Sequence, residues 1–352
     1  MNTADKKFTG NAIEFWRIIF TLMIVLQHLT TFYPKFLETY SLVGGWYVGV
    51  EFFFIVSGYL LAKKSKEHNM TALQYQVNRF RRLYPMYILA FTVSFLFMNV
   101  CVEHNSITII VYNLLHNADE VLMLQLFGTN KIVVYNIVTW YISAMFIAGY
   151  IVYWLVINHR KSFVEFIAPL SVMVIYSYHY RVYGSSMQWY ITNELFLNTG
   201  LTRAFAGMSL GVIGYELSVN SWRDKILRHQ KLLTFVEVMG YLTVIVVSVK
   251  WGRSTLDFLC ILILSVCVPL SFQHEVHWKW TGISKYCYSI YLNHHIFCAT
   301  IFPMFYSTEE HSFKILALYL IVVIVYSVIL QILLDNILSV LRHRFNGGQN
   351  GN

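Results

Sequence analysis

Long apolar stretches alternate with short polar segments along almost the whole chain. A helix needs about 20 mostly apolar residues to cross a membrane. The pattern therefore predicts an all-α membrane protein, a bundle of about ten transmembrane helices in a single domain over residues 1–345, followed by a disordered tail at 346–352. The ten predicted spans are residues 12–33, 44–62, 84–101, 136–157, 163–182, 201–218, 232–250, 255–272, 284–306 and 313–340.

The composition supports a membrane protein. Hydrophobic residues make up 57% of the 352 residues and charged residues only 12%, whereas an average soluble domain carries about 25% charged residues. The net charge is +8, but the basic residues lie in short loops between apolar stretches. We interpret them as signals for membrane orientation and expect no nucleic-acid partner. The five cysteines lack paired or metal-type spacing, so we expect no disulfide framework and no metal site.

The distribution of Lys and Arg predicts the topology. With the N-terminus inside, eighteen of the 26 Lys and Arg residues fall in inside segments and seven in outside segments. Both termini are therefore expected to be cytoplasmic. A further stretch, 107–127, is apolar at both ends and polar in the middle. If it crossed the membrane, the basic loops after it would face outward, so we place it on the outer surface as a lid or interfacial helix pair.

Arg17 and His28 lie eleven positions apart in the first predicted helix. Eleven residues make about three turns, so both side chains share one face and lie roughly 16 Å apart along the axis. A charge inside a spanning helix costs on the order of 2.5–3.5 kcal/mol or more, and such residues usually serve a function. The alternatives are an Arg17 that anchors the helix at the interface and a His28 that packs in the core. Their shared face argues against both alternatives.

Glu51 lies in the second predicted helix at a depth similar to that of His28. A carboxylate beside an imidazole orients the ring and favours its protonated form. We therefore hypothesise that Glu51 orients His28, and the alternative is a carboxylate in a water-filled vestibule.

Three arginines, Arg79, Arg81 and Arg82, precede a proline that fits the first turn of the third predicted helix. Arginines at a helix N-terminus form an anion site through their fork geometry and the helix dipole. The alternative is that they act only as a topology signal.

Several motifs occur in order across about 280 residues. They are Arg17-x10-His28, GVEFFFIVSGYL around Glu51, Arg79-x-x-Arg82 before LYP, WYISAM from Trp140, and CYSIYLNH from Cys287 to His294. Together they resemble the acyltransferase 3 family of bacterial integral-membrane transferases, in which the position of Glu51 is usually Asp.

The resemblance implies a ten-helix bundle in the bacterial cytoplasmic (inner) membrane that moves an acyl group, often acetyl, from cytoplasmic acyl-CoA to a carbohydrate hydroxyl. It implies that His28 is the catalytic histidine and that Arg79 with Arg82 engages the donor. Acyl-CoA is then a substrate rather than a permanently bound cofactor. The other expected partners are a surface polysaccharide or lipid-linked glycan acceptor and the lipid bilayer, and the oligomeric state is open. His28 acts either as a general base or as a covalent acyl relay.

Five further residues are weaker candidates for substrate binding, and packing or a vestibule charge is the alternative role for each. They are His294, Arg203, Trp140, Tyr291 and Glu194, and Arg203 either binds the acceptor or orients Glu194. The competing function is a transporter or exporter of a lipid-linked sugar or small anion. Transporters often show paired internal repeats and broken helices, and this sequence shows neither.

Overall fold

The computed structural model describes residues 11–126, 135–184, 187, 193–194, 197–221, 229–273, 280–309 and 311–347. Within these residues the fold is helical apart from one pair of two-residue antiparallel strands, β1 (Asn193–Glu194) and β2 (Leu197–Asn198). This confirms the predicted all-α class.

Fifteen α-helices are described, and short 3₁₀ or π segments extend several of them. The helices are α1 (Asn11–Phe32), α2 (Pro34–Thr39), α3 (Gly49–Glu67), α4 (Ala72–Leu96), α5 (Ile107–His116), α6 (Ala118–Val121), α7 (Trp140–Ser162), α8 (Ala168–Tyr183), α9 (Thr199–Glu216), α11 (Gln230–Trp251), α12 (Leu256–Ser271), α13 (Thr281–Ser284), α14 (Cys287–Ile296), α15 (Phe302–Phe305) and α16 (Phe313–Gly347). The short segments are η1 (Trp46–Val48), η2 (Phe97–Val102), η3 (Ile137–Thr139), η4 (Phe163–Ile167), η5 (Leu217–Ser221) and η6 (Phe297–Ile301).

Helices occupy each of the ten predicted ranges. Among the described residues, six helical segments are long and apolar enough to cross a membrane. One of them, Ile137–Tyr183, contains both α7 and α8 and has a non-helical backbone at His159 (φ −137°, ψ 37°). The helical class is thus established, and the number of ten spans stays a prediction. The helix α16 continues to Gly347, so most of the predicted tail lies outside the described residues.

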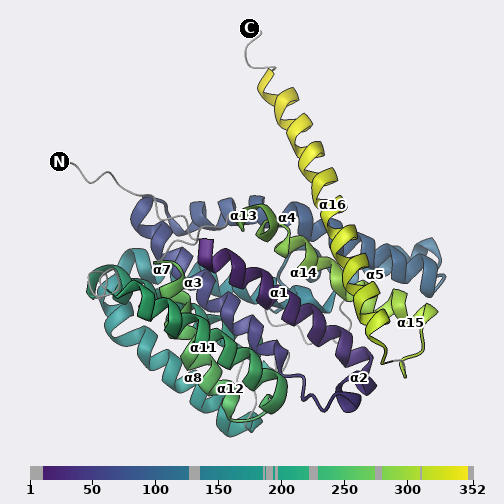
Figure 1. Ribbon diagram of the computed structural model, residues 1–352. Coiled ribbons are helices and arrows are strands. Elements are labelled where there is room, and N and C mark those ends of the chain that lie inside the picture. The colour runs from purple at the N-terminus through teal and green to yellow at the C-terminus, as the bar shows by residue number, and fades with distance from the viewer. Residues whose placement is uncertain are drawn as a thin grey trace.

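The long helices form a bundle in which the axes of α1, α3, α11 and α12 are similarly inclined (Figure 1). Helix α9 packs against α3, α7, α8 and α12. The start of α1 and the end of α16 both lie toward the upper side of Figure 1, whereas α2 lies on the lower side. The two ends of the described chain therefore lie on the same side of the bundle, and their cytoplasmic location stays a prediction.

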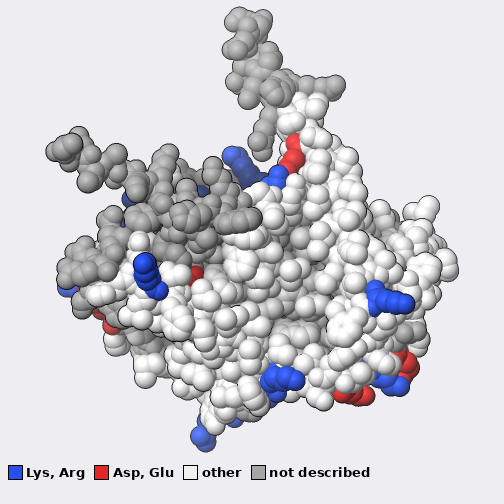
Figure 2. All heavy atoms as spheres, viewed as in Figure 1, with Lys and Arg blue, Asp and Glu red and all other residues white. Residues whose placement is uncertain are grey.

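The surface of the bundle is largely apolar. In Figure 2, charged residues gather near the ends of the visible face, and the wide area between them is uncharged. Large apolar side chains are exposed along α11 and α16, among them Phe235, Val246, Ile321 and Ile332. Such a surface suits contact with lipid chains, because the helices satisfy their own backbone hydrogen bonds.

Glycines bring α3 and α9 into close contact. A Cβ atom on Gly58 would lie 2.0 Å from the backbone oxygen of Met208, and one on Gly211 would lie 2.1 Å from that of Ile55. Small residues allow this approach between membrane helices. Arg203, Gly207 and Gly211 are spaced four residues apart, so they share the face of α9 that meets α3. This contact sets the register between the two helices.

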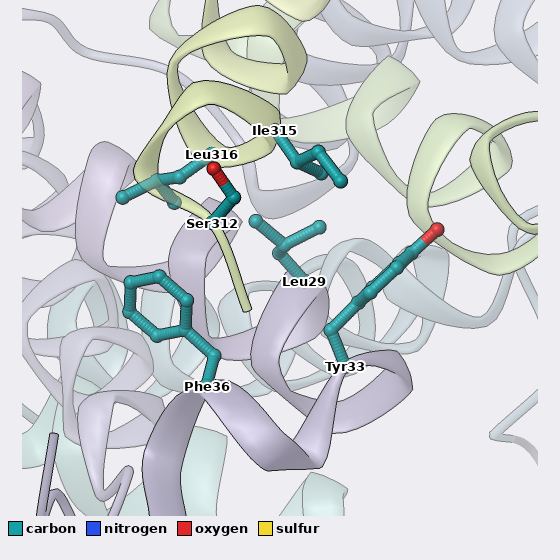
Figure 3. A pocket seen from close by; sticks show the side chains of 6 residues that line it. All are labelled: Leu29, Tyr33, Phe36, Ser312, Ile315 and Leu316. Atoms are coloured by element: carbon teal, nitrogen blue, oxygen red, sulfur yellow. The ribbon is translucent and has the colours of Figure 1, made fainter. Parts of the chain in front are cut away.

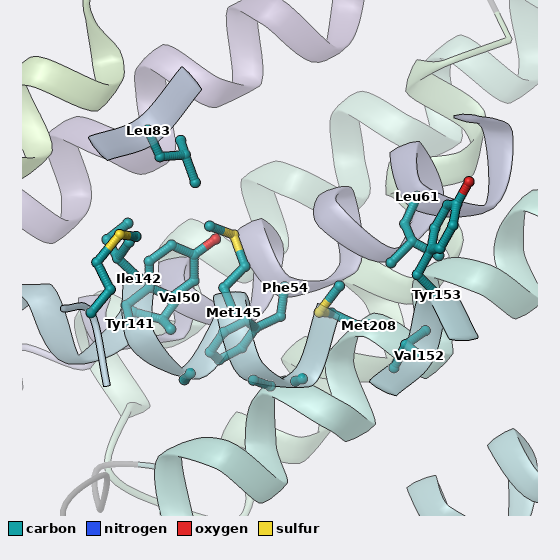
Figure 4. Packing of buried hydrophobic residues seen from close by; sticks show 14 of the residues in the cluster. Val50, Phe54, Leu61, Leu83, Tyr141, Ile142, Met145, Val152, Tyr153 and Met208 are labelled. Atoms are coloured by element: carbon teal, nitrogen blue, oxygen red, sulfur yellow. The ribbon is translucent and has the colours of Figure 1, made fainter. Parts of the chain in front are cut away.

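Buried side chains from α3, α7 and α9 fill the space around this contact. Figure 4 shows Phe54, Tyr141, Met145 and Met208 packed together from these three helices. The core therefore holds the start of α7 against α3 and α9.

The third predicted helix begins earlier than expected. The Thr71 hydroxyl accepts a hydrogen bond from the Gln74 backbone N–H (3.2 Å), and the Gln74 side chain accepts one from the Thr71 N–H (2.9 Å). This capping box starts α4 at Ala72, and Pro85 lies inside the helix. The prediction that the arginines occupy a helix N-terminus is therefore wrong. Arg79 lies about two turns into α4.

The segment predicted as a surface lid contains α5 and α6. Helix α5 has 10 residues and buries none of them, so it is too short to cross a membrane. In α6 the Glu120 carboxylate is buried and accepts hydrogen bonds from the backbone N–H groups of Tyr135 and Asn136, both at 3.0 Å. Burial raises the pKa of Glu120 to about 7. Glu120 therefore ties this segment to the start of α7.

The helix contact can be tested at Gly58. Gly58→Ala places a methyl group against the backbone of α9, and overpacking of this kind costs about 1–3 kcal/mol. We expect a lower unfolding temperature in detergent. Gly282→Ala is the matched control, because a Cβ at Gly282 meets no atom within 4 Å. Equal unfolding temperatures for the two variants would contradict the proposed role of the glycine contact.

The buried Glu120 predicts a pH dependence. Its folded-state pKa of about 7 lies above the ordinary value of 4.5, so docking disfavours the ionised form. The free energy that holds the α5–α6 segment in place should fall as the pH rises from 4.5 to 7, by on the order of 3 kcal/mol, and stay constant above pH 7. Hydrogen exchange of residues 107–126, corrected for intrinsic rates, measures this change. Glu120→Gln should remove the pH dependence. Equal protection of the unmodified protein at pH 5 and pH 8 would refute the predicted pH dependence.

Candidate active site

Two histidines from α1 and α14 meet inside the bundle. The Nδ1 atom of His28 lies 3.1 Å from Nε2 of His294, and the two ring centroids are 4.9 Å apart. His28 Nδ1 also lies 2.9 Å from the backbone oxygen of Ile24, and His294 Nδ1 lies 2.7 Å from that of Tyr291. His294 is completely buried, and His28 is partly buried.

These contacts decide which nitrogen of each neutral ring carries a proton. A carbonyl oxygen only accepts hydrogen bonds, so Nδ1 of His294 must donate to Tyr291, which leaves a lone pair on its Nε2. Nδ1 of His28 likewise carries the proton, which it shares between Ile24 and His294. The free lone pair of His28 is therefore on Nε2. An imidazole in this state can accept a proton from a hydroxyl group.

The second polar cluster contains a buried ion pair. Glu51 Oε1 lies 2.8 Å from Nε and 2.7 Å from Nη2 of Arg203, and the Tyr176 hydroxyl donates to Glu51 Oε2 at 3.1 Å. The Arg203 guanidinium lies over the Trp140 ring, 5.6 Å from its centroid. The glycine contact between α3 and α9 places the two charges together.

The partner predicted for Glu51 differs from the observed ones. Among the described residues, Glu51 bonds to Arg203 and Tyr176, and His28 bonds to Ile24 and His294. The expected contact between Glu51 and His28 is not formed. Glu194 ends β1, and its side chain lies outside the described residues.

A basic cavity of about 300 Å³ lies between the end of α3 and the first half of α4. Arg79 and Arg82 both line it, whereas Arg81 does not, although Arg81 and Arg82 are both exposed. Arg79 is buried, and its Nη1 donates to the Tyr75 hydroxyl at 3.0 Å. Its buried Nε has no hydrogen-bond partner within the described residues. The full lining is Ser57, Leu60, Leu61, Lys63, Lys64, Glu67, His68, Tyr75, Asn78, Arg79 and Arg82.

A row of side-chain contacts joins the basic cavity to the histidines. Ser57 lines the cavity and interacts with the Tyr141 hydroxyl. The Tyr141 ring packs against Tyr291 with centroids 5.6 Å apart, and Tyr291 packs against His294 at 5.9 Å. The predicted residue Tyr291 thus lies beside the histidine pair. Tyr141 was missed by sequence reasoning, although it lies in the WYISAM motif directly after Trp140.

A family model described as an acyltransferase domain (acyltransferase 3) matches residues 11–335, nearly the whole chain. The chain belongs to the acyltransferase 3 family. This confirms the resemblance seen in the motifs. Neither the curated proteins nor the solved structures gave a match. Family membership and the apolar helices together establish a multi-pass membrane acyltransferase.

In this acyltransferase, Arg17 pairs with Glu14, with Nη1 2.8 and 3.0 Å from the two carboxylate oxygens. Glu14 also accepts a hydrogen bond from Ser284 at the end of α13. Arg17 is close enough to Arg82 and Tyr141 to interact with both electrostatically. Arg17 therefore lies at the basic end of the contact row. His28, eleven positions further along α1, lies at the other end.

The described residues offer little capacity for a ligand at two other kinds of site. The small pocket in Figure 3, between Leu29, Tyr33, Phe36 and the start of α16, has a volume of about 10 Å³. A volume of this size holds no more than about one water molecule. In the described part of the acyltransferase, no group of three or more His, Cys, Asp or Glu side chains is arranged to hold a metal ion.

The buried ion pair predicts a large effect on stability. Arg203→Leu leaves the Glu51 carboxylate uncompensated in the core, and breaking such a pair costs about 3–5 kcal/mol. The double variant with Glu51→Leu should recover much of this loss, because both charges of this pair are then removed. Unfolding of the purified protein in a denaturing detergent titration measures both, with the exposed Arg81→Leu as control. A double variant no more stable than Arg203→Leu would contradict the interpretation of Glu51 and Arg203 as a buried ion pair.

Proposed function

We propose that this protein is a membrane O-acyltransferase that moves an acyl group, with acetyl as the first candidate, from cytoplasmic acyl-CoA to a hydroxyl of a surface polysaccharide or lipid-linked sugar. Its proposed location is the inner membrane of a bacterium. One observation carries the proposal: a contact row joins a basic cavity to a histidine whose Nε2 has a free lone pair.

The basic cavity suits the nucleotide end of acyl-CoA. That end carries several phosphate charges, and four of the lining residues are cationic: Lys63, Lys64, Arg79 and Arg82. Arginine forks bind phosphate oxygens in pairs. Because α4 begins at Ala72, the side chains rather than a helix N-terminus supply these contacts. The pantetheine arm then follows Ser57, Tyr141 and Tyr291 toward the histidines.

His28 supplies the base in this proposal. The acceptor hydroxyl gives its proton to His28 Nε2 while its oxygen attacks the thioester carbonyl carbon. The C–S bond breaks, and the CoA thiolate takes the proton back from Nε2. The products are the O-acyl ester and free CoA, and His28 returns to its neutral state. The alternative, in which His28 first takes the acyl group, uses the same lone pair.

The acceptor is proposed to approach from the opposite end to the donor. In the predicted topology, the start of α3 and the last third of α1 both face the outer side. Trp140 and the Glu51–Arg203 pair lie near that end, and aromatic faces beside polar groups suit a sugar. The position of these residues supports an acceptor site on the outer side of His28.

The donor site is tested by a matched pair of arginine variants. Arg82→Gln should weaken acetyl-CoA binding about tenfold or more, because a hydrogen bond to a charged group contributes roughly 1.5–3 kcal/mol. Arg81→Gln should bind nearly as well as the unmodified protein, because Arg81 does not line the cavity. Calorimetric titration of protein in lipid nanodiscs measures both. His28→Gln should keep donor binding, and mass spectrometry of the surface glycans should show that the acyl group is lost.

Two results would count against the proposal. Retained glycan acylation in His28→Gln would remove the histidine from the reaction. If acetyl-CoA fails to bind in both detergent and lipid, the competing transporter function would be favoured.

A further inference from the structure

The base in this site has an unexpected partner. A catalytic histidine is commonly oriented by a carboxylate, and Glu51 was expected in that role. Glu51 instead bonds to Arg203 and Tyr176. His28 Nδ1 shares its proton between the Ile24 backbone oxygen and the ring of His294. We propose that His294 is the positioning residue of His28, in the place of a carboxylate. This inference rests on the proposed function.

The surroundings of His294 leave its ring one role. The backbone oxygen of Tyr291 takes the Nδ1 proton at 2.7 Å, so Nε2 can only accept. The backbone of α14 is also held at this point. Asn136 donates to the Leu292 oxygen at 2.8 Å, and the Tyr319 hydroxyl donates to the His294 oxygen at 3.3 Å. A buried ring on a held backbone keeps its lone pair directed at His28.

The neighbouring histidine does not take this role. The His295 ring centroid lies 6.0 Å from that of His28, and the His295 ring also contacts Phe32. Within the described residues, His295 makes no hydrogen bond to His28. Of these two adjacent histidines of α14, His294 is therefore the one that hydrogen-bonds to the base.

The hydrogen bond has a consequence during the reaction. When His28 takes a proton on Nε2, it becomes an imidazolium, and its Nδ1–H bond to His294 becomes charge-assisted and stronger. The Nδ1 proton of His294 points into a carbonyl oxygen that cannot pass it on. The positive charge therefore goes no further than the two histidines, and the proton accepted on Nε2 returns from there to the thiolate. His294 orients the base and supports its charged form without relaying the proton.

Three variants of the full-length protein test this role in native membranes, which hold the native acceptor. They are His294→Phe, which removes the acceptor atom, His294→Gln, whose amide oxygen can still accept, and His295→Phe, the matched control. The probe is acetyl-CoA, and the readout is free CoA released over time. We expect His294→Phe to lower kcat about 10–100-fold, the range found when the partner that orients a metal-bound imidazole is removed, with an unchanged KM for acetyl-CoA. His294→Gln should recover most of kcat, and His295→Phe should stay close to the unmodified protein.

Three outcomes would overturn the inference. They are an unchanged kcat in His294→Phe, an equal loss in His294→Phe and His294→Gln, and an equal loss in His295→Phe. The second would show that the hydrogen-bond acceptor at this position does not matter.

A second measurement does not depend on turnover. In ¹⁵N-histidine-labelled protein in lipid, NMR should detect a coupling across the hydrogen bond between His28 Nδ1 and His294 Nε2, with the His28 signals assigned by their loss in His28→Gln. Absence of this coupling would overturn the inference even if CoA is released. Presence of the coupling in a protein that releases no CoA would refute the proposed function instead.

Discussion

In the interior of a membrane protein, each charged or strongly polar side chain needs a partner within the protein, because no water is present to replace it. This constraint decides which polar residues of this chain meet. Arg203 pairs with Glu51, Arg17 with Glu14, and His294 with a backbone carbonyl of its own helix. Once those partners are taken, His28 is left with one free lone pair, which is the property that a base requires. The availability of His28 as a base thus follows from the ion pairs and hydrogen bonds that the surrounding polar side chains form.

Close contact between helices allows buried charged side chains to find partners within the protein. The glycines of α3 and α9 bring two backbones together, and the Glu51–Arg203 pair lies on the same line of contact. The start of α7 packs on both helices and carries Trp140 to the ion pair and Tyr141 to the contact row. The fold therefore links a basic cavity at one end to a histidine pair further along the bundle. An anionic donor with a long arm and a reactive end matches this arrangement.

The sequence was informative where a signal is local. Long apolar stretches predicted helices, and ordered motifs predicted the acyltransferase family. The Arg79–Arg82 spacing predicted two residues that line one cavity. The apolar stretch at residues 84–101 predicted a later start for α4 than the one that the capping box of Thr71 and Gln74 sets.

Partners distant in the sequence were not predictable in the same way. Glu51 and Arg203 are 152 positions apart, and His28 and His294 are 266 positions apart. Which of them meet depends on the register between helices, and the motifs contain no measure of it. Glycine spacing on α9 was the one available signal for the first pair, and no local signal existed for the second.

The central claim is that one donor molecule extends from the basic cavity to His28. A structure of the protein in lipid with a non-hydrolysable acetyl-CoA analogue tests it most directly. We predict phosphates at Arg79 and Arg82 and the acyl carbonyl beside Nε2 of His28. Phosphates bound elsewhere, or an acyl group that does not approach His28, would contradict this account.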